Sequence, residues 1–189
     1  MTSRSSGPDL NDDLTRILID QPTIERRVKE MAHQVSTDFA DVEQLVVVGV
    51  LKGAFIFLAD LCRYLTVPHR VDFISLSSYN QTTVSSGVVR LIMDLKTNIE
   101  GRSVLIVEDI VDSGYTLDYL MRNFATRRPA ALRSCVLLSK PERRQVNVRI
   151  DYLGFEIPDV WVVGYGLDYS DTYRTLPYIA ELSSRVYQK

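Results

Sequence analysis

One stretch of fourteen residues, 104–117 (VLIVEDIVDSGYTL), constrains the fold of this chain more than any other part. Four apolar residues, 104–107, lead directly into the carboxylates of Glu108 and Asp109. A continuous apolar run of this kind is typical of a strand buried on both faces of a parallel sheet. Ligands of open α/β sheets bind beyond the carboxyl ends of such strands. We therefore expect Glu108 and Asp109 at the point where the sheet opens onto a crevice.

The residues after this acidic pair predict a phosphate site. A third carboxylate, Asp112, is followed by Ser113, Gly114, Tyr115 and Thr116, where an amphipathic helix is expected to begin. The free amides and partial positive charge of a helix N-terminus suit an anion, and carboxylates accept hydrogen bonds from the hydroxyls of a ribose diol. A sugar that carries a 5′-phosphate satisfies both demands. The alternative is a solvated strand end and an aspartate that only caps the helix.

The bulk properties of the chain favour an ordinary globular protein. Its 189 residues fit a single domain over 11–189, preceded by a disordered tail over 1–10. No apolar run is long enough to span a membrane, and a net charge of −2 argues against binding nucleic acid by charge alone. Cys62 and Cys135 lie in apolar runs, as buried thiols do in a reducing compartment. We expect a cytoplasmic protein with neither membrane nor nucleic-acid partners.

Periodicity predicts strands that alternate with helices along the chain. Apolar residues at helical spacing predict helices over 24–39, 54–65 and 117–124, and a short helix over 176–182. Apolar or alternating runs predict strands over 45–51, 71–77, 88–93, 104–107, 132–138 and 161–163, with a polar loop over 80–87. This order predicts an α/β fold in which helices cover both faces of a mostly parallel sheet.

The stretch 104–117 resembles the phosphoribosyl pyrophosphate signature of the type I phosphoribosyltransferases. Its spacing of two acids, two apolar residues and a third acid is similar to that of the hypoxanthine-guanine members. The similarity covers roughly residues 22–180 and includes VLKG at 50–53, SY at 78–79, SKP at 139–141 and PDVWVVGYGLDY at 158–169. The resemblance implies the fold of that family, with a small hood built from about 11–30 and 140–189, and a homodimer or homotetramer.

The resemblance also implies a reaction of purine salvage. In it, the 5-phosphoribosyl group of phosphoribosyl pyrophosphate passes to hypoxanthine or guanine, giving IMP or GMP and pyrophosphate. Asp112 is then the general base, which bonds purine N7 while N9 attacks. Glu108 and Asp109 bind the ribose hydroxyls, directly or through Mg²⁺, and Asp168 is a further metal contact. Taken alone, Asp168 would be predicted to be a turn residue.

Family resemblance assigns the anionic groups of the substrate to two further segments. The 5′-phosphate is bound by Ser113, Gly114, Tyr115 and Thr116. Pyrophosphate is bound by Lys52, Gly53 and Arg174, and the family often has a cis peptide just before this lysine. Either basic residue alone is more often solvated surface.

The resemblance places the purine against three residues. Trp161 stacks on the ring, Lys140 donates to O6 of hypoxanthine or guanine, and the carbonyl of Val162 accepts from the 2-amino group of guanine. A lone tryptophan beside valines would otherwise be predicted to lie in the core. Ser78 and Tyr79 begin the family's mobile loop, which closes over the site and excludes water.

Two other functional classes fit parts of this sequence. A nucleotide-sensing or RNA-binding regulator could share the fold without turnover, although it would not need Asp112, Lys140 and Lys52 together. A phosphate-accepting receiver domain also has an acidic pair after an apolar strand, but near its N-terminus and with an aspartate on a later strand. The strand over 132–138 has no aspartate, and no dinucleotide or P-loop glycine motif occurs.

Overall fold

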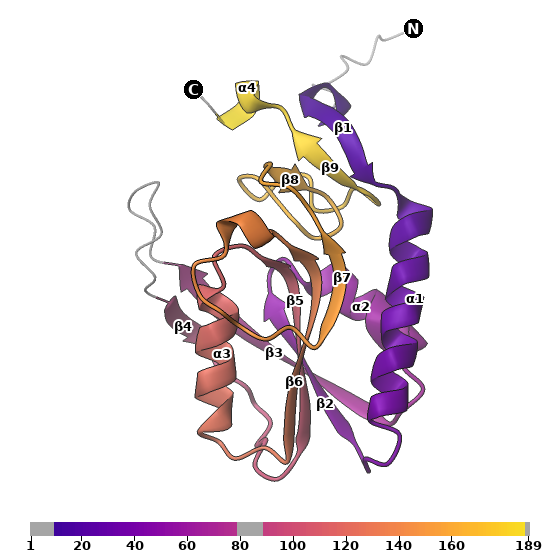
Figure 1. The fold of residues 1–189 in the computed structure, drawn as a ribbon, viewed down its shortest axis with the longest axis vertical. Coiled ribbons are helices and arrows are strands. Elements are labelled where there is room, and N and C mark those ends of the chain that lie inside the picture. Colours follow the sequence, from indigo (N-terminus) through magenta and orange to yellow (C-terminus); the bar gives the residue numbers. More distant parts are fainter. Residues whose placement is uncertain (1–9, 79–88, 188–189) are drawn as a thin grey trace, which may run out of the picture.

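A six-stranded sheet forms the centre of the molecule. The computed structural model describes residues 10–78 and 89–187 (Figure 1). The strands lie in the order β4-β3-β2-β5-β6-β7, and all pair in parallel except β4, which is antiparallel to β3. The predicted, mostly parallel sheet is thus confirmed. Its strands are β2 (Leu45–Leu51), β3 (His69–Ser78), β4 (Val89–Met93), β5 (Ser103–Val111), β6 (Ala131–Ser139) and β7 (Tyr152–Glu156).

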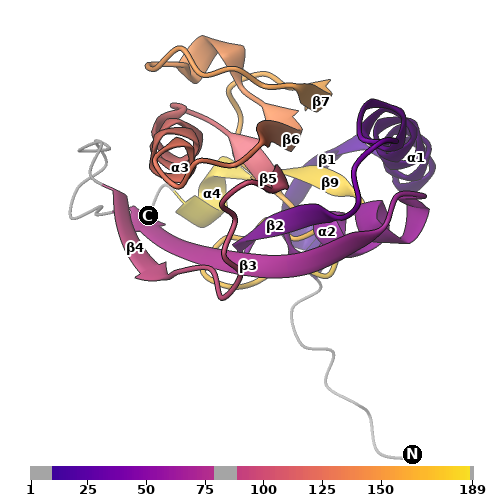
Figure 2. The same cartoon turned by 90° about the horizontal axis from the view of Figure 1, so that it is seen from below.

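Helices cover both faces of this sheet. Figure 2 shows α1 (Gln21–Asp38) and α2 (Phe55–Tyr64) on one side and α3 (Tyr115–Ala125) on the other. Successive side chains of β5 alternate between two apolar clusters, because side chains of a strand point to opposite faces in turn. Val107 packs in the cluster with α1 and α2, whereas Ile106 packs in the cluster with α3. No helix in the described ranges is both long and apolar enough to cross a membrane.

A second, three-stranded sheet forms the hood that the fold class predicts. β1 (Leu14–Ile19) and β8 (Val162–Val163) flank β9 (Ile179–Leu182), and all pairs are antiparallel. The short elements around it are η1 (Leu10–Asp13), η2 (Pro141–Arg143) and α4 (Ser184–Tyr187). β1 and β9, which are far apart in the sequence, therefore pair above the main sheet (Figure 1). The hood limits 11–30 and 140–189, and the single domain over 11–189, stay predictions.

The predicted helix over 176–182 is wrong. Residues 179–182 form strand β9 instead, and Ile179, Ala180 and Leu182 are buried in it. This strand pairs with β1, whose Leu14 lies opposite Leu182, and with β8, whose Val163 lies opposite Ala180. Because the pairing joins residues far apart in the sequence, local periodicity gave no sign of it, and β1 itself was not predicted.

The signature strand is longer than predicted. Pairing of β5 with β6 continues to Val111, so Glu108 and Asp109 lie within the strand rather than beyond its end. The predicted loop over 80–87, residue Tyr79 and most of the predicted tail lie outside the described residues.

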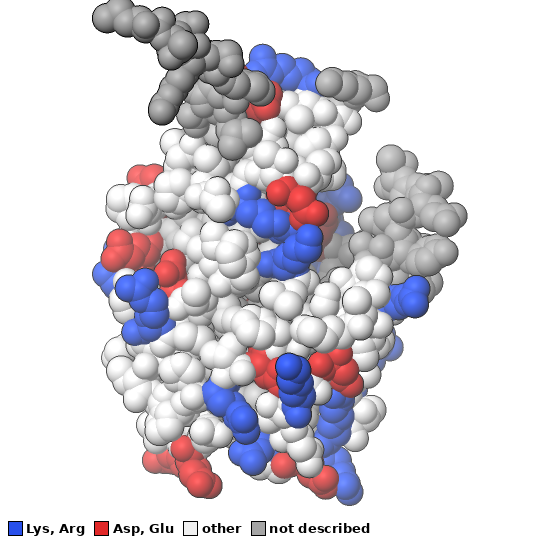
Figure 3. All heavy atoms as spheres, turned by 180° about the vertical axis from the view of Figure 1, so that it is seen from behind, with Lys and Arg blue, Asp and Glu red and all other residues white. Residues whose placement is uncertain are grey.

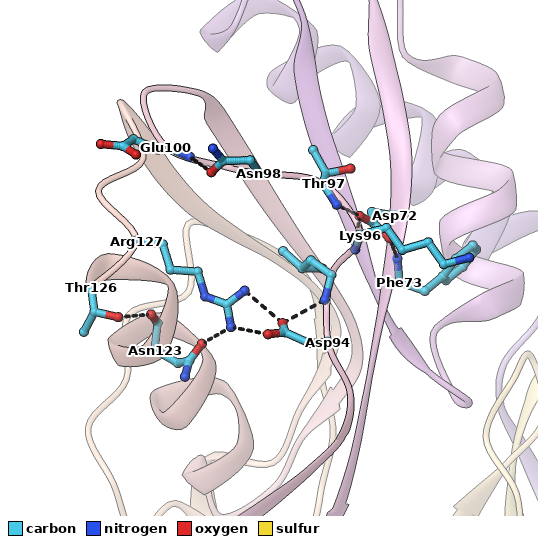
Figure 4. Close-up of polar contacts among 11 residues, drawn as sticks. Asp72, Phe73, Asp94, Lys96, Thr97, Asn98, Glu100, Asn123, Thr126 and Arg127 are labelled. Carbon is cyan, nitrogen blue, oxygen red and sulfur yellow. Dashed lines mark hydrogen bonds and ion pairs between the residues drawn. The ribbon is translucent and has the colours of Figure 1, made fainter.

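One buried carboxylate ties the connection between β4 and β5 to the sheet. Asp72 of β3 is only 8% exposed and accepts hydrogen bonds from the amides of Phe73 (2.8 Å), Lys96 (3.0 Å) and Thr97 (2.7 Å) (Figure 4). Burial acts to raise the pKa of Asp72, but the hydrogen bonds from Thr97 and its neighbours outweigh it and lower that pKa. The carboxylate thereby fixes the loop that leads into the signature strand.

The same connection is held from its other side by an exposed ion pair. Arg127 donates to both carboxylate oxygens of Asp94, at 2.8 and 3.0 Å, and to Asn123 of α3 at 2.7 Å (Figure 4). This bidentate pair joins the end of α3 to the loop after β4.

We expect Asp72→Ala to lower the free energy of unfolding at pH 7 by about 2 to 3 kcal/mol, because three amides lose a charged acceptor. Urea unfolding measures this loss, and Asp94→Ala is the matched control, with a cost of about 1 kcal/mol or less. The folded pKa of Asp72 lies below its unfolded value of 3.8. The stabilisation that the Asp72 carboxylate gives to the fold is therefore fully present above pH 3.8 and is lost as the pH falls through the folded pKa. A loss for Asp72→Ala that persists undiminished in acid would contradict this assignment.

Candidate active site

A cavity of about 850 Å³ opens beside the carboxyl ends of β2, β5 and β6, beneath the hood. It gathers nine of the predicted site residues, which are Lys52, Gly53, Asp109, Asp112, Lys140, Trp161, Val162, Asp168 and Arg174. These residues come from four separate segments of the sequence. The fold therefore places in one cavity the residues that the motifs only suggested should meet.

The two acids of the signature lie on opposite faces of β5. Asp109 lines the cavity, whereas Glu108 is buried and 5% exposed. Among the described residues nothing hydrogen-bonds Glu108 Oε2. Burial, reinforced by the charge of Asp109, raises the pKa of Glu108 well above its usual value, and the guanidinium of Arg144 opposes that rise. The predicted ribose and metal roles of Glu108 stay predictions.

Asp109 is held against the backbone of Gly53. Burial raises the pKa of Asp109 to about 6, and the negative charge of Asp168 adds to the rise. A Cβ at Gly53 would overlap the Asp109 carboxylate, and a Cβ at Gly166 would overlap the Gly53 carbonyl oxygen. The Leu51–Lys52 peptide just before this contact is cis, as the resemblance implies. Glycine is thus required because three segments approach one another closely.

The predicted phosphate turn forms a sharp bend at the start of α3. Gly114 has φ of +93°, a left-handed conformation that glycine adopts readily, and its Cβ would lie 2.9 Å from the carbonyl oxygen of Val146. The carbonyl of Ser113 accepts from the amides of Gln145 and Val146, at 3.0 and 3.1 Å. Within the described part of the chain no side chain caps α3, so its first amides are available to an anion.

Asp112 contacts an arginine and does not cap the helix. Arg143 Nε donates to Asp112 Oδ1 at 2.7 Å, and its Nη1 lies 3.5 Å from Asp159 Oδ1. Lys140 Nζ lies 3.9 Å from the same oxygen of Asp159. The alternative in which Asp112 is only a helix cap is therefore wrong. Sequence reasoning missed Arg143 and Asp159, although Pro141 signals the short turn that returns Arg143 to the site.

Lys140 is a buried cation, only 7% exposed. Burial lowers its pKa, while the carboxylates of Asp112 and Asp159 act to raise it. A partly desolvated ammonium beside two carboxylates is a strong hydrogen-bond donor that has no capacity to accept.

Trp161 is half exposed and belongs to an aromatic cluster over the cavity. Its ring stacks on Tyr187 at 5.4 Å and meets Tyr169 edge to face at 5.6 Å. An exposed fraction of 46% contradicts the alternative in which Trp161 is a core residue. Tyr187 was missed because no local pattern connects the last turn of the chain to residue 161.

The two basic residues predicted for pyrophosphate share an acidic partner. Lys52 and Arg174 both bond to Asp171, and Arg174 Nη2 also lies 2.7 Å from Asp168 Oδ1. Lys52 and Arg174 are therefore both paired with carboxylates and are not isolated surface charges. Asp171 was missed because a lone aspartate in a loop carries no signal. Ser78 is the last residue of β3. The role of Ser78 and Tyr79 in a loop that closes over the site stays a prediction.

Within residues 10–78 and 89–187, no cluster of three or more acidic, histidine or cysteine side chains could hold a metal ion. Asp109 and Asp168 both line the cavity, and the negative charge of Asp168 contributes to the raised pKa of Asp109. Two such carboxylates fit Mg²⁺ only if the remaining ligands come from water and substrate.

Comparison with known proteins supports one family. The model of the phosphoribosyl transferase domain matches residues 15–170. The hypoxanthine-guanine phosphoribosyltransferase of Dictyostelium discoideum is 47% identical over 92% of this chain and 98% of its own length. A hypoxanthine phosphoribosyltransferase structure from Staphylococcus aureus has a TM-score of 0.91 at 39% identity, over 95% of this chain and 97% of that one. A Trypanosoma cruzi enzyme of the same name has a TM-score of 0.89 at 45% identity, over 96% and 97%.

We expect Gly53→Ala to destabilise the protein by about 1 to 3 kcal/mol, because the new methyl group overlaps the Asp109 carboxylate. The matched test is the double variant Gly53→Ala/Asp109→Ala, which removes the obstructing group and should recover most of the loss. Urea unfolding of the two single variants and the double variant gives the coupling between the positions. Additive losses would show that the backbone, and not the carboxylate, resists the methyl group.

Proposed function

This chain belongs to the phosphoribosyl transferase domain family, and we propose that it transfers the 5-phosphoribosyl group of phosphoribosyl pyrophosphate to hypoxanthine or guanine. The products are IMP or GMP and pyrophosphate, so the enzyme serves purine salvage. One observation carries this proposal: a single cavity is lined by the Asp112 carboxylate, the buried Lys140 ammonium and the Lys52 and Arg174 cations. These groups match the chemistry of the purine and of the leaving group.

The reaction breaks the bond from ribose C1′ to the pyrophosphate oxygen, while purine N9 forms a new bond to C1′. The purine must lose a proton, for which a carboxylate held beside the ring is a suitable acceptor. Arg143 bonds to one oxygen of Asp112, at 2.7 Å. In this proposal the arginine orients Asp112 so that its other oxygen meets N7 of the purine.

Purine recognition rests on groups that can only donate or only accept. Lys140 offers a proton to O6 of hypoxanthine or guanine and has no acceptor for the amino group of adenine. The carbonyl of Val162 would accept from the 2-amino group of guanine, and the exposed ring of Trp161 would stack on the purine.

The anionic ends of the substrate are proposed to bind at two places. The uncapped amides at the start of α3, with the hydroxyls of Ser113 and Thr116, receive the 5′-phosphate. Lys52, Gly53 and Arg174 receive the pyrophosphate, supported by the two basic side chains that border the cavity. Asp109 accepts from the ribose hydroxyls.

Mg²⁺ is part of the proposal. Asp109 and Asp168 would hold it together with substrate oxygens, and the like charge that Asp168 adds to the cavity beside Asp109 favours a cation there. When bound, the ion neutralises charge on the departing pyrophosphate. The carboxylates of this chain position the sugar whether or not they contact the metal directly.

The proposal also includes the cellular compartment and the oligomeric state of the enzyme. Burial raises the pKa of the unpaired thiol of Cys62 to about 11 and that of Cys135 further, so both are poor nucleophiles, as expected of cytoplasmic proteins. A homodimer or homotetramer is proposed because Val71 and Phe73 expose apolar side chains on one face of β3. Light scattering in solution would test self-association.

The regulatory alternative gains nothing from the comparisons, whose relatives are named as phosphoribosyltransferases. Figure 3 shows that lysine, arginine and acidic side chains are interspersed on the face drawn there, without a continuous basic surface. Such a face does not suit the backbone of a nucleic acid.

The direct test is to incubate the purified protein with magnesium, phosphoribosyl pyrophosphate and hypoxanthine, guanine, xanthine or adenine, and to measure the nucleotide formed. Asp112→Asn should reduce turnover by about ten- to ten-thousand-fold, the range expected for a lost general base, while affinity for the sugar substrate stays near normal. Turnover of the variant at the wild-type rate would remove Asp112 from the mechanism.

Lys140→Met keeps the apolar stem of the side chain and removes its donor. We expect the preference for hypoxanthine over adenine, as a ratio of kcat/KM values, to fall by about ten- to a hundredfold. Arg63→Met is the matched control, since Arg63 is an exposed cation on α2 outside the lining of this cavity. Preserved discrimination in Lys140→Met would show that another group reads O6.

A further inference from the structure

A single carboxylate bridges both cations that the proposed function assigns to pyrophosphate. Lys52 Nζ lies 3.0 and 3.1 Å from the two carboxylate oxygens of Asp171, and Arg174 Nη2 lies 2.8 Å from Oδ1. Lys52 follows β2, whereas Asp171 and Arg174 precede β9. The bridge therefore joins the main sheet to the segment that leads into the hood.

The loop backbone places this carboxylate. Ser170 and Asp171 both have left-handed φ angles, of +51° and +59°, which are uncommon outside glycine. Tyr169 and Thr172 exchange two backbone hydrogen bonds across the turn, and the amide of Asp171 donates to Asp168 Oδ2 at 2.8 Å. Asp171 is thus held over the cations by a turn that closes on itself.

The carboxylate has the chemistry of a ligand fragment. An anion with two oxygens on a lysine and an arginine reproduces the contacts that these side chains make with a phosphoryl group. Hydrogen bonds from Arg174 and Lys52 lower the pKa of Asp171, so it stays ionised. Its side chain is 64% exposed and can rotate into solvent, and exposed ion pairs of this kind are weak. A more highly charged anion can therefore displace it.

We propose that Asp171 is an internal anion that occupies the place of pyrophosphate in the empty enzyme and is displaced by the pyrophosphoryl end of the substrate. The inference rests on the proposed function, which assigns Lys52 and Arg174 to that group. Between turnovers Asp171 keeps the two cations oriented. After the reaction it competes with product pyrophosphate for them and so promotes release. Asp171 is a positioning residue, since it acts through Lys52 and Arg174.

The test is Asp171→Asn, which keeps the shape of the side chain and tolerates the left-handed backbone. Titration calorimetry with magnesium pyrophosphate should show binding that is about three- to tenfold tighter, the factor expected when weak competing ion pairs are removed. Product inhibition by pyrophosphate should strengthen by the same factor, with KM for hypoxanthine unchanged. Glu100→Gln is the matched control, because it removes one negative charge in the loop before β5 and should alter neither value.

The outcomes separate this inference from the proposed function. If the wild-type protein binds pyrophosphate and Asp171→Asn binds it no tighter, only the role of Asp171 is overturned. If the wild-type protein fails to bind pyrophosphate, the proposed function itself fails. A crystal structure with pyrophosphate bound should show Asp171 turned away from Lys52, and an intact bridge beside bound pyrophosphate would overturn the inference.

Discussion

The contact of the Asp109 carboxylate with the backbone of Gly53 is the constraint on which the site depends. It brings the ends of β2 and β5 together, and Gly166 packs in turn on the Gly53 carbonyl. The Asp109 carboxylate and Gly166 therefore both approach Gly53, which is possible because the two glycines carry no side chain. The cost of this contact is the burial of the Asp109 carboxylate, which raises its pKa to about 6. Hydrogen-bond donors or a cation beside this carboxylate would relieve that cost.

Except for β7, the central sheet was predictable because its strands carry their own signal. β2, β5 and β6 each contain a run of apolar residues, as strands covered on both faces do. The hood was less predictable. Residues 179–182 gain their strand conformation from pairing with β1 and β8, which local periodicity does not reveal. Propensity was overridden there by pairing between distant segments.

The site residues also divide into those with a local sequence signal and those without one. Residues inside motifs, such as Asp112, Lys140 and Trp161, were found and do line one cavity. Residues that matter through contacts with those side chains were missed. Arg143, Asp171 and Tyr187 belong to no quoted motif, and Asp159 lies in the motif at 158–169 but was given no role there. The sequence also could not tell that β5 continues through the acids, and hence that Glu108 and Asp109 face opposite ways.

The pairing of β1 with β9 has a consequence for folding during synthesis on the ribosome. Leu14 leaves the ribosome well before its partner Leu182. The strands of the six-stranded sheet end at Glu156 and are all synthesised before β9, whereas β1 has unpaired backbone groups until residues 179–182 have been made. Pairing within the hood therefore comes after all strands of the main sheet are available, and a chain that ends before residue 179 lacks the strand to which β1 and β8 both pair.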